Sequence, residues 1–367
     1  MKIATVVGAR PQFVKAAAVS RAIRDRNTSV EEKLIHEIII HTGQHFDNNM
    51  SQIFFDEMEI PAPNYNLCVS GGTHAAMTGR MLDRIESVLM DLRPECVLVY
   101  GDTNSTLAGA LAAIKLHIPI AHVEAGLRSF NMRMPEEINR ILTDRISTLL
   151  FCPTSTAVTN LKGEGITSGV HLVGDVMYDA ALHYSAYART RSSILQQCGV
   201  MDGEYVLATI HRAENTNDPE GIKSILSGFG KVSERMPIIL PLHPRTRKRI
   251  NELDLGIMLR DINVIDPVSF IDMVRLEQSA AVIITDSGGV QKEAYFAGVP
   301  CITLRDETEW TETADSGWNA LVGTDSNKLI CAFESAVTRH PSRSNEKPYG
   351  DGKAARKIIE LLLQIVE

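Results

Sequence analysis

A glycine turn in the second half of the chain has the residue types that bind phosphate. The apolar run from Ala281 to Thr285 predicts a strand, and Asp286-Ser287-Gly288-Gly289-Val290-Gln291-Lys292-Glu293 follows it and leads into a predicted helix. Adjacent glycines let the backbone approach a ligand, and the N–H groups at a helix start attract an anion. Ser287 and Glu293 could add side-chain contacts. Such a turn is, by itself, also compatible with an ordinary strand-to-helix connection.

Three acidic residues could transfer protons at a substrate carbon: Asp102, Glu124 and Glu136. Each follows a predicted buried strand directly or at a short interval, and a carboxylate in a partly desolvated cleft among its own kind has its pKa raised toward neutrality. Structural roles remain open. Asp102 could cap a helix that begins at Thr103, and Glu136 could lie in the first turn of a helix after Pro135.

Several cationic and histidine side chains could bind an anionic substrate. Arg10 and Lys15 span the start of a predicted helix, where they could meet a diphosphate or a sugar carboxylate, although Lys15 could instead face solvent. Arg128 and Arg140 could hold the acids or the substrate. Histidines near strand ends could contact the diphosphate or leaving group, or form structural hydrogen bonds, and these are His211 and, as similar candidates, His45 and His122.

The elements that must position these residues alternate between strand and helix, which is typical of βαβ units and a parallel sheet. About five strands are expected in each half of the chain. They cover residues 3–7, 37–41, 96–100, 120–123 and 149–152, and then residues 205–209, 238–242, 263–265, 281–285 and 301–304. Ligands of such sheets bind beyond the carboxyl ends of the strands, where the polar residues above are placed. A cleft between two domains is therefore expected.

A chain of 367 residues is longer than a single core usually supports, so we expect two domains. The predicted fold class is α/β, with two Rossmann-like doubly wound parallel sheets. Residues 1–174 would carry the acids and would be joined by a closing helix over residues 353–367. Residues 175–352 would carry the glycine turn, and the chain would cross between the domains near Gly174-Asp175-Val176.

Composition excludes several classes of function. The net charge of −8 and the lack of a long basic stripe argue against nucleic-acid binding, and the short basic cluster at residues 245–249 is read as a solvated helix face rather than an anion site. Six cysteines without C-x-x-C spacing fit a reducing cytoplasm. No apolar run is long enough to cross a membrane. We expect no metal, since no metal-ligand spacing occurs, and no NAD, since no G-x-G-x-x-G turn follows the first strand.

Five motifs together resemble the non-hydrolysing UDP-N-acetylglucosamine 2-epimerases. They are, in chain order, Gly8 to Lys15, Gly101-Asp102-Thr103, His122 to Arg128, Pro135 to Arg140 and Asp286 to Glu293, and the resemblance extends from residue 1 to about residue 325. It implies a two-domain fold like that of B-type glycosyltransferases, a homodimer, and no cofactor beyond the nucleotide-sugar itself.

The resemblance also implies roles for single residues. Active-site groups of the family correspond to Arg10, Lys15, Asp102, Glu124, Glu136, Arg140 and His211. Residues that hold UDP correspond to Ser287, Gly288, Gly289 and Glu293, and the predicted substrate-binding set also includes Arg128, His243 and Phe270. In the implied reaction, loss of UDP across C1 and C2 gives a glycal, and re-addition of UDP resets C2. The acids would move the C2 proton, while cations and helix-turn N–H groups would stabilise the departing diphosphate.

Three departures from the family pattern concern the substrate. Gln12 replaces the usual Glu, Trp310 replaces the usual Arg, and Arg133 precedes the Pro135-Glu136 pair. A lost acid and a gained cation would suit a sugar that carries a carboxylate, whereas Trp310 removes a cation. Phe46-Asp47 also departs from the polar residues of the family's second, regulatory sugar site.

The sequence therefore predicts an isomerase that converts UDP-N-acetylglucosamine to UDP-N-acetylmannosamine, in lipopolysaccharide or other polysaccharide biosynthesis. One alternative is the same chemistry on UDP-2,3-diacetamido-2,3-dideoxyglucuronate, because several motifs look closest to that subgroup. The alternative of another class is a B-type UDP-sugar glycosyltransferase.

Overall fold

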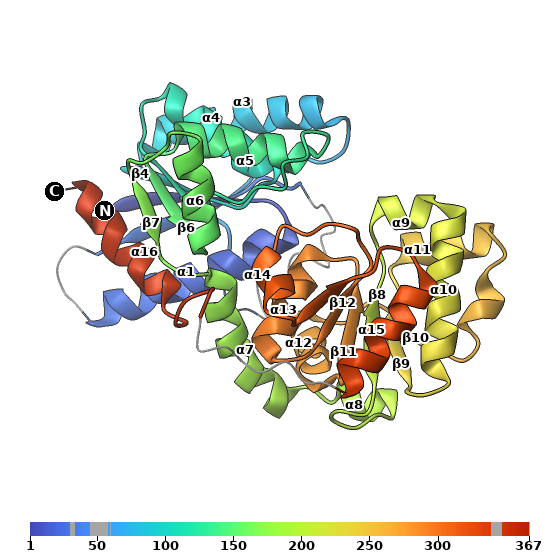
Figure 1. Cartoon of the computed structure of the whole chain (residues 1–367). Coiled ribbons are helices and arrows are strands. Elements are labelled where there is room, and N and C mark those ends of the chain that lie inside the picture. The colour runs from blue at the N-terminus through green and yellow to red at the C-terminus, as the bar shows by residue number, and fades with distance from the viewer. Residues whose placement is uncertain (30–33, 45–57, 59, 339–346, 367) are drawn as a thin grey trace. The chain divides into compact units, whose positions relative to one another are not determined.

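The computed structural model describes residues 1–29, 34–44, 58, 60–338 and 347–366. The chain divides into two compact units (Figure 1). Unit 1 comprises Met1–Ala180 and Lys347–Glu367, and unit 2 comprises Ala181–Glu346. Each unit is an α/β fold around one parallel sheet, so the predicted fold class is confirmed.

Unit 1 holds a seven-stranded sheet in the order β3-β2-β1-β4-β5-β6-β7, and every strand pairing is parallel. The chain order reverses between β1 and β4, which creates a switch point where side chains beyond the two strand ends converge. The strands are β1 (Lys2–Val7), β2 (His36–His41), β3 (Tyr65–Asn66), β4 (Cys96–Tyr100), β5 (Ile120–Val123), β6 (Leu149–Cys152) and β7 (Val170–Leu172).

Unit 2 repeats this plan with six parallel strands in the order β10-β9-β8-β11-β12-β13, and its switch point lies between β8 and β11. The strands are β8 (Val206–Thr209), β9 (Ile238–Pro241), β10 (Asn263–Ile265), β11 (Val282–Thr285), β12 (Cys301–Thr303) and β13 (Asn319–Leu321).

All ten predicted strands are present, each with ends within one residue of the prediction, but the expectation of five strands in each half was wrong. The missed strands are β3, β7 and β13, and each is a sheet-edge strand of only two or three residues. An edge strand pairs on one side only and is often short, so it lacks the long apolar run of a central strand.

Helices cover both faces of each sheet, as a doubly wound fold requires (Figure 1). Those of unit 1 are α1 (Arg10–Ser29), α3 (His74–Leu92), α4 (Asn104–Lys115), α5 (Pro135–Ile146), α6 (Ser155–Gly163) and α16 (Ala354–Leu362), with α7 (Val176–Arg191) continuing into unit 2. Those of unit 2 are α8 (Ile194–Cys198), α9 (Ala213–Asn217), α10 (Pro219–Ser233), α11 (Pro244–Glu252), α12 (Phe270–Ser279), α13 (Gly288–Ala297), α14 (Thr311–Asp315) and α15 (Ser326–Thr338).

The C-terminal segment belongs to unit 1. Helix α16 packs against α1 and is followed by a short 3₁₀ turn at Leu363–Val366, so the predicted closing helix ends earlier than residue 367. Among the helices of the described residues, none is both long and apolar enough to cross a membrane.

The core of unit 2 yields a stability prediction. Leu329 on α15 is 1% exposed and packs against α10, where a Cβ on Gly228 would lie 3.3 Å from its Cδ1, whereas Val337 on the same helix is 41% exposed. We expect Leu329→Ala to lower the free energy of unfolding by about 3 kcal/mol, because it leaves a cavity. The matched change Val337→Ala should cost less than about 0.5 kcal/mol. Equal losses in urea unfolding would contradict this packing.

Candidate active site

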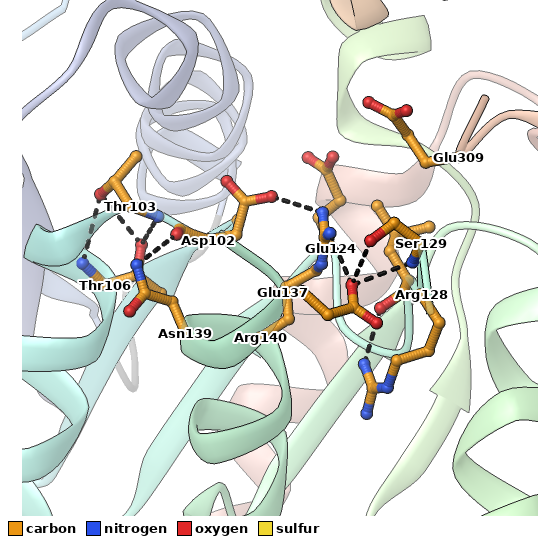
Figure 2. Close-up of polar contacts among 12 residues, drawn as sticks. Asp102, Thr103, Thr106, Glu124, Arg128, Ser129, Glu137, Asn139, Arg140 and Glu309 are labelled. Carbon is orange, nitrogen blue, oxygen red and sulfur yellow. Dashed lines mark hydrogen bonds and ion pairs between the residues drawn. The ribbon is translucent and has the colours of Figure 1, made fainter. Parts of the chain in front are cut away.

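Two of the predicted acids of unit 1 follow neighbouring strands, β4 at the switch point and β5 beside it. Asp102 is the second residue after β4, and Glu124 follows β5 directly. The carboxylate of Asp102 is 30% exposed and accepts a hydrogen bond from Nη1 of Arg140 at 2.7 Å (Figure 2). Its backbone oxygen accepts another from Nδ2 of Asn139 at 2.8 Å. Helix α5 therefore holds both the carboxylate and the backbone carbonyl of Asp102.

Burial raises the pKa of Asp102. The nearby cations Arg140 and Lys15 oppose this shift, and the negative charges of Glu124 and Glu136 add to it. A carboxyl group with a raised pKa can both accept and return a proton near neutral pH. Of these four side chains, the sequence predicted Glu124, Glu136 and Arg140 beside Asp102, whereas it expected Lys15 at a diphosphate or sugar carboxylate.

Lys15 and Glu124 form a buried ion pair, so the alternative of a solvent-facing Lys15 was wrong. Glu124 has a left-handed backbone, with φ of +72°, which is uncommon for a residue with a side chain. Strain of this kind persists where the surrounding structure fixes the residue, and it often marks functional sites. The N–H groups of Glu124 and Ala125 both donate to the carbonyl of Phe151 at 3.1 Å, which anchors this turn.

Helix α5 buries a polar face and exposes an apolar one, the reverse of an ordinary surface helix. Ile138 and Leu142 are 40% and 45% exposed. The buried residues are Glu137, Asn139, Arg140, Thr143 and Asp144. Since buried polar groups cost free energy unless they are paired, this face indicates a functional requirement rather than core packing.

Glu137 is a site residue that the sequence prediction missed. Its carboxylate accepts from the N–H and hydroxyl of Ser129 at 2.9 and 3.0 Å, from the N–H of Phe130 at 3.0 Å and from Nη2 of Arg140 at 2.7 Å (Figure 2). Burial favours a higher pKa, but the hydrogen bonds from Ser129 and Arg140 outweigh it and lower the pKa of Glu137. Glu137 therefore stays charged and orients Arg140 toward Asp102.

The sequence left open a structural role for Asp102 as a helix cap and for Glu136 as a first-turn residue of α5, and the structure supports only the second. Asp102 does not cap α4, because Thr103 is the N-cap and its side chain accepts from the N–H of Thr106. Glu136 does lie in the first turn of α5, after Pro135, and it is exposed.

Unit 2 places polar groups around its own switch point. Asp286 follows β11 and is fully buried, and its carboxylate accepts from the N–H groups of His211 and Arg212 at 3.1 and 3.0 Å and from Nδ2 of Asn215 at 3.2 Å. Nδ1 of His211 also lies 3.2 Å from this carboxylate, while the His211 side chain is 49% exposed. Asp286 thus orients a half-exposed imidazole, a role that the sequence prediction did not assign.

The glycine turn has the predicted strand-turn-helix form. Ser287 is the N-cap of α13, and its hydroxyl accepts from the N–H of Val290 at 3.5 Å. A Cβ on Gly288 would lie only 2.5 Å from Oε1 of Glu309, so a larger residue here would have to displace that side chain. Gly289 has no such close neighbour, and Glu293 is partly buried farther along the helix.

Comparison with known proteins gives the family. A family model described as UDP-N-acetylglucosamine 2-epimerase matches residues 28–363. The chain belongs to the UDP-N-acetylglucosamine 2-epimerase family. It is 50% identical over 369 residues to UDP-2,3-diacetamido-2,3-dideoxy-D-glucuronate 2-epimerase of Pseudomonas aeruginosa, with all of both chains covered.

Solved structures agree with this assignment. The Methanocaldococcus jannaschii UDP-GlcNAc 2-epimerase in complex with UDP-GlcNAc and UDP has a TM-score of 0.90 and 44% identity, over 99% of this chain and 100% of that one. The Neisseria meningitidis enzyme bound to UDP-GlcNAc has a TM-score of 0.87 and 33% identity, again over 99% and 100% of the two chains. The protein is therefore an isomerase of the UDP-sugar 2-epimerase type, and the glycosyltransferase alternative is not supported.

Two departures from the family pattern have structural partners within their own units. Gln12 of this epimerase is 1% exposed, and its carbonyl accepts from the N–H groups of Gly8 and Ala9 at 2.8 and 3.1 Å. Its amide donates to the carbonyl of Tyr100 and the hydroxyl of Thr106, both at 2.9 Å. Gln12 therefore fastens the turn after β1 to the end of β4, and the interpretation as a lost acid facing the sugar was wrong.

Trp310 also has a structural partner. Its ring lies 3.8 Å from Nζ of Lys292, and both side chains are buried. A cation over an aromatic face is stabilised by the ring quadrupole, so Trp310 offsets part of the cost of burying Lys292. A second cation at position 310 would lose this attraction.

Arg128 is not brought to the acids near Asp102. It is buried, and its guanidinium pairs with Asp144 at 2.7 Å and with both carboxylate oxygens of Glu164 at 2.6 and 2.8 Å. Its predicted contact with substrate has no geometric support. His122 is also fully buried, between Gly101 and Asp144, which agrees with the alternative of structural hydrogen bonds.

The remaining predicted residues are at other places in the two units. His243 is the exposed N-cap of α11, and Phe270 is buried with its ring edge-on to Tyr184 at 5.1 Å. Exposed Arg247 and Lys248 pair with acids of unit 2, which fits a solvated helix face at residues 245–249.

Two predicted sites remain near the N-terminus of the chain. Arg10 is the first residue of α1. His45 and Phe46-Asp47 lie outside the described residues.

The pKa of Asp102 gives a pH-dependent prediction. Because folding raises this pKa from its ordinary 3.8, the folded epimerase holds the proton more tightly than the unfolded chain does. The free energy of unfolding should fall as pH rises from 3.8 through the folded-state pKa, and the loss should persist above it. Asp102→Asn cannot ionise, so its stability relative to wild type should increase from about pH 4 to about pH 7 in urea unfolding.

Asp325 is the control with the opposite sign. The N–H groups of Lys328 and Asn327 lower its pKa, so its ionised form stabilises the folded protein above the ordinary value and this contribution is lost at low pH. The stability of Asp325→Asn relative to wild type should decrease as pH rises through the ordinary value of 3.8, and it should then stay nearly constant up to about pH 7. Parallel trends in the two variants would contradict the raised pKa of Asp102.

Proposed function

We propose that this protein interconverts UDP-N-acetylglucosamine and UDP-N-acetylmannosamine. A proton leaves C2 as the bond between C1 and the diphosphate oxygen breaks, which gives a 2-acetamidoglycal and UDP. A diphosphate oxygen then attacks C1, and a proton returns to the other face of C2. The proposal is carried by Asp102, a partly exposed carboxyl with a raised pKa, surrounded by Lys15, Glu124, Glu136 and Arg140.

Division of labour between the units follows from their chemistry. In unit 1, Asp102, Glu124 and Glu136 would transfer the protons, with Lys15 and Arg140 balancing the negative charge near the sugar. In unit 2, the N-terminus of α13, with Ser287, Gly288 and Gly289, would hold the diphosphate, and His211 would contact the leaving group. Helix N–H groups suit the charge that develops as UDP departs. Arg10, His243, Phe270 and Glu293 remain proposed substrate contacts.

A second candidate substrate is UDP-2,3-diacetamido-2,3-dideoxyglucuronate. It is supported by the 50% identity over the full length of the Pseudomonas aeruginosa enzyme named for that sugar. The reaction at C2 would be the same. The two substrates differ at C3 and C6, so the distinction lies in groups around the sugar rather than in the acids.

We also propose a homodimer that works in the cytoplasm, on UDP-sugars for polysaccharides such as lipopolysaccharide. Ile138 and Leu142 on α5, together with Phe130 and Met132 in the preceding loop, are exposed apolar side chains that a second copy could cover. All six cysteines are free thiols, which suits a reducing compartment.

Incubation with each UDP-sugar alone in deuterated water tests the function and ranks the substrates. We expect the C2 epimer to form without any acceptor, with solvent deuterium at C2 of both product and recovered substrate, because the C2 proton leaves and returns. The preferred substrate should show the higher kcat/KM when the two are assayed side by side. Hydrolysis without epimer, or an epimer that retains the original hydrogen at C2, would refute the mechanism.

Replacing Asp102 tests the acid at the centre of the site. Asp102→Asn keeps the shape of the side chain but cannot take a proton, so kcat should fall by about 10²-fold or more. UDP affinity, measured by calorimetry, should stay within about threefold of wild type, because the proposed UDP site is in unit 2. The matched change Asp325→Asn, at the exposed start of α15, should leave both unchanged. Near-normal turnover of Asp102→Asn would remove this residue from the mechanism.

A further inference from the structure

One buried carboxylate of unit 1 contacts groups beside both of the proposed catalytic acids. Asp144 on α5 is 1% exposed. Its Oδ1 lies 2.7 Å from Nδ1 of His122, and its Oδ2 accepts from the N–H of Gly126 at 3.1 Å and from Nη1 of Arg128 at 2.7 Å. Asp144 is too deeply buried to contact a substrate, so any effect on catalysis must act through these partners.

The ring of His122 lies between the carboxylate of Asp144 and the carbonyl oxygen of Gly101. Its Nε2 lies 2.7 Å from the carbonyl oxygen of Gly101, which can only accept, so Nε2 donates. Nδ1 faces Asp144, and that carboxylate is ionised. Burial favours a higher pKa for Asp144, but the hydrogen bond and charge of His122, with those of Arg128, outweigh it and lower the pKa. A ring that donates to both of these acceptors would carry a proton on each nitrogen.

The backbone groups held in this way lie next to the acids. Gly101, with φ of +60°, directly precedes Asp102, and its N–H donates to the carbonyl of Val123 at 2.9 Å. Gly126, with φ of +81°, comes two residues after Glu124. A Cβ on Gly126 would lie 2.5 Å from the carbonyl oxygen of Ala157, so this turn is closely packed as well as hydrogen-bonded.

We propose that Asp144 is the positioning residue that fixes Asp102 and Glu124 relative to each other. It holds the turn after β4 through the ring of His122, and it holds the turn after β5 directly through the N–H of Gly126. This role rests on the proposed function, since it matters only if the two acids act on one substrate. Displacements of about 1 Å in such groups can cost about 10²-fold in rate.

The kinetic test compares Asp144→Asn with Glu164→Gln. Both changes neutralise a carboxylate that pairs with Arg128, but only Asp144 contacts His122 and Gly126. We expect Asp144→Asn to lower kcat about 100-fold, with KM within about threefold, and Glu164→Gln to stay within about threefold in both. Assays run well below each thermal midpoint separate this loss from unfolding. Equal losses of kcat in the two variants would overturn the proposal, and so would a change in Asp144→Asn that was confined to KM.

A double-mutant cycle tests whether Asp144 acts through His122. His122→Gln offers one nitrogen in place of two, so it should also lower kcat. The double variant should lose much less than the product of the two single losses, because both changes break one linkage. If the loss of kcat in the double variant equalled the product of the two single losses, Asp144 and His122 would act independently, and the proposal would be overturned.

A spectroscopic measurement does not depend on activity. Nitrogen-15 spectra of the histidine rings should show His122 protonated on both nitrogens near neutral pH in wild type, and on one nitrogen in Asp144→Asn. A neutral His122 in wild type would overturn the linkage even if the variants failed to fold. Conversely, if wild type did not epimerise any UDP-sugar while His122 was doubly protonated, the proposed function would fail and the pairing would stand.

Discussion

A carboxylate that loses its water at the end of a parallel sheet must find donors within the protein, and this constraint shapes unit 1. Glu137 takes donors from a loop and from Arg140, and Asp144 takes them from His122, a backbone N–H and Arg128. These pairings keep both groups charged. Asp102 differs, because it is partly exposed and its pKa is raised. Glu137 and Asp144 hold the scaffold, and Asp102, the one of these three carboxylates whose pKa is raised, is the one proposed for chemistry.

Helix α5 connects this interior to the outside of unit 1. Its polar face supplies Arg140, Asn139 and Asp144 to the site, while Ile138 and Leu142 remain exposed. A helix with this pattern gains little from burying apolar surface against its own sheet. Its buried face is stabilised by paired charges, and its outer face would be stabilised only by a partner. The buried side of α5 therefore supplies polar groups to the site, and its exposed side supplies apolar groups to the proposed dimer.

Unit 2 uses the same topology for a different task. A buried Asp286 arranges the turn after β8, and the glycine turn after β11 presents the start of α13. Departures from the family pattern contribute to the scaffold of both units: Gln12 joins two strand ends, and Trp310 covers Lys292. Neither therefore argues directly for a particular sugar, and the substrate must be distinguished by groups around C3 and C6.

The sequence alone determined the fold class, the glycine turn and all strands of the structure except the short edge strands β3, β7 and β13, because apolar runs, glycines and strand-to-helix order are local signals. It also placed Asp102 and Glu124 together, since each follows a strand of the same sheet. It expected Lys15 at a diphosphate or sugar carboxylate, whereas the structure pairs Lys15 with Glu124. Only the tertiary structure decided which partner each polar group takes. It moved Arg128 to Asp144 and Glu164, turned Gln12 inward and revealed His122 as a linker. Such pairings depend on helices and strands that are distant in sequence, so no local pattern of residues encodes them.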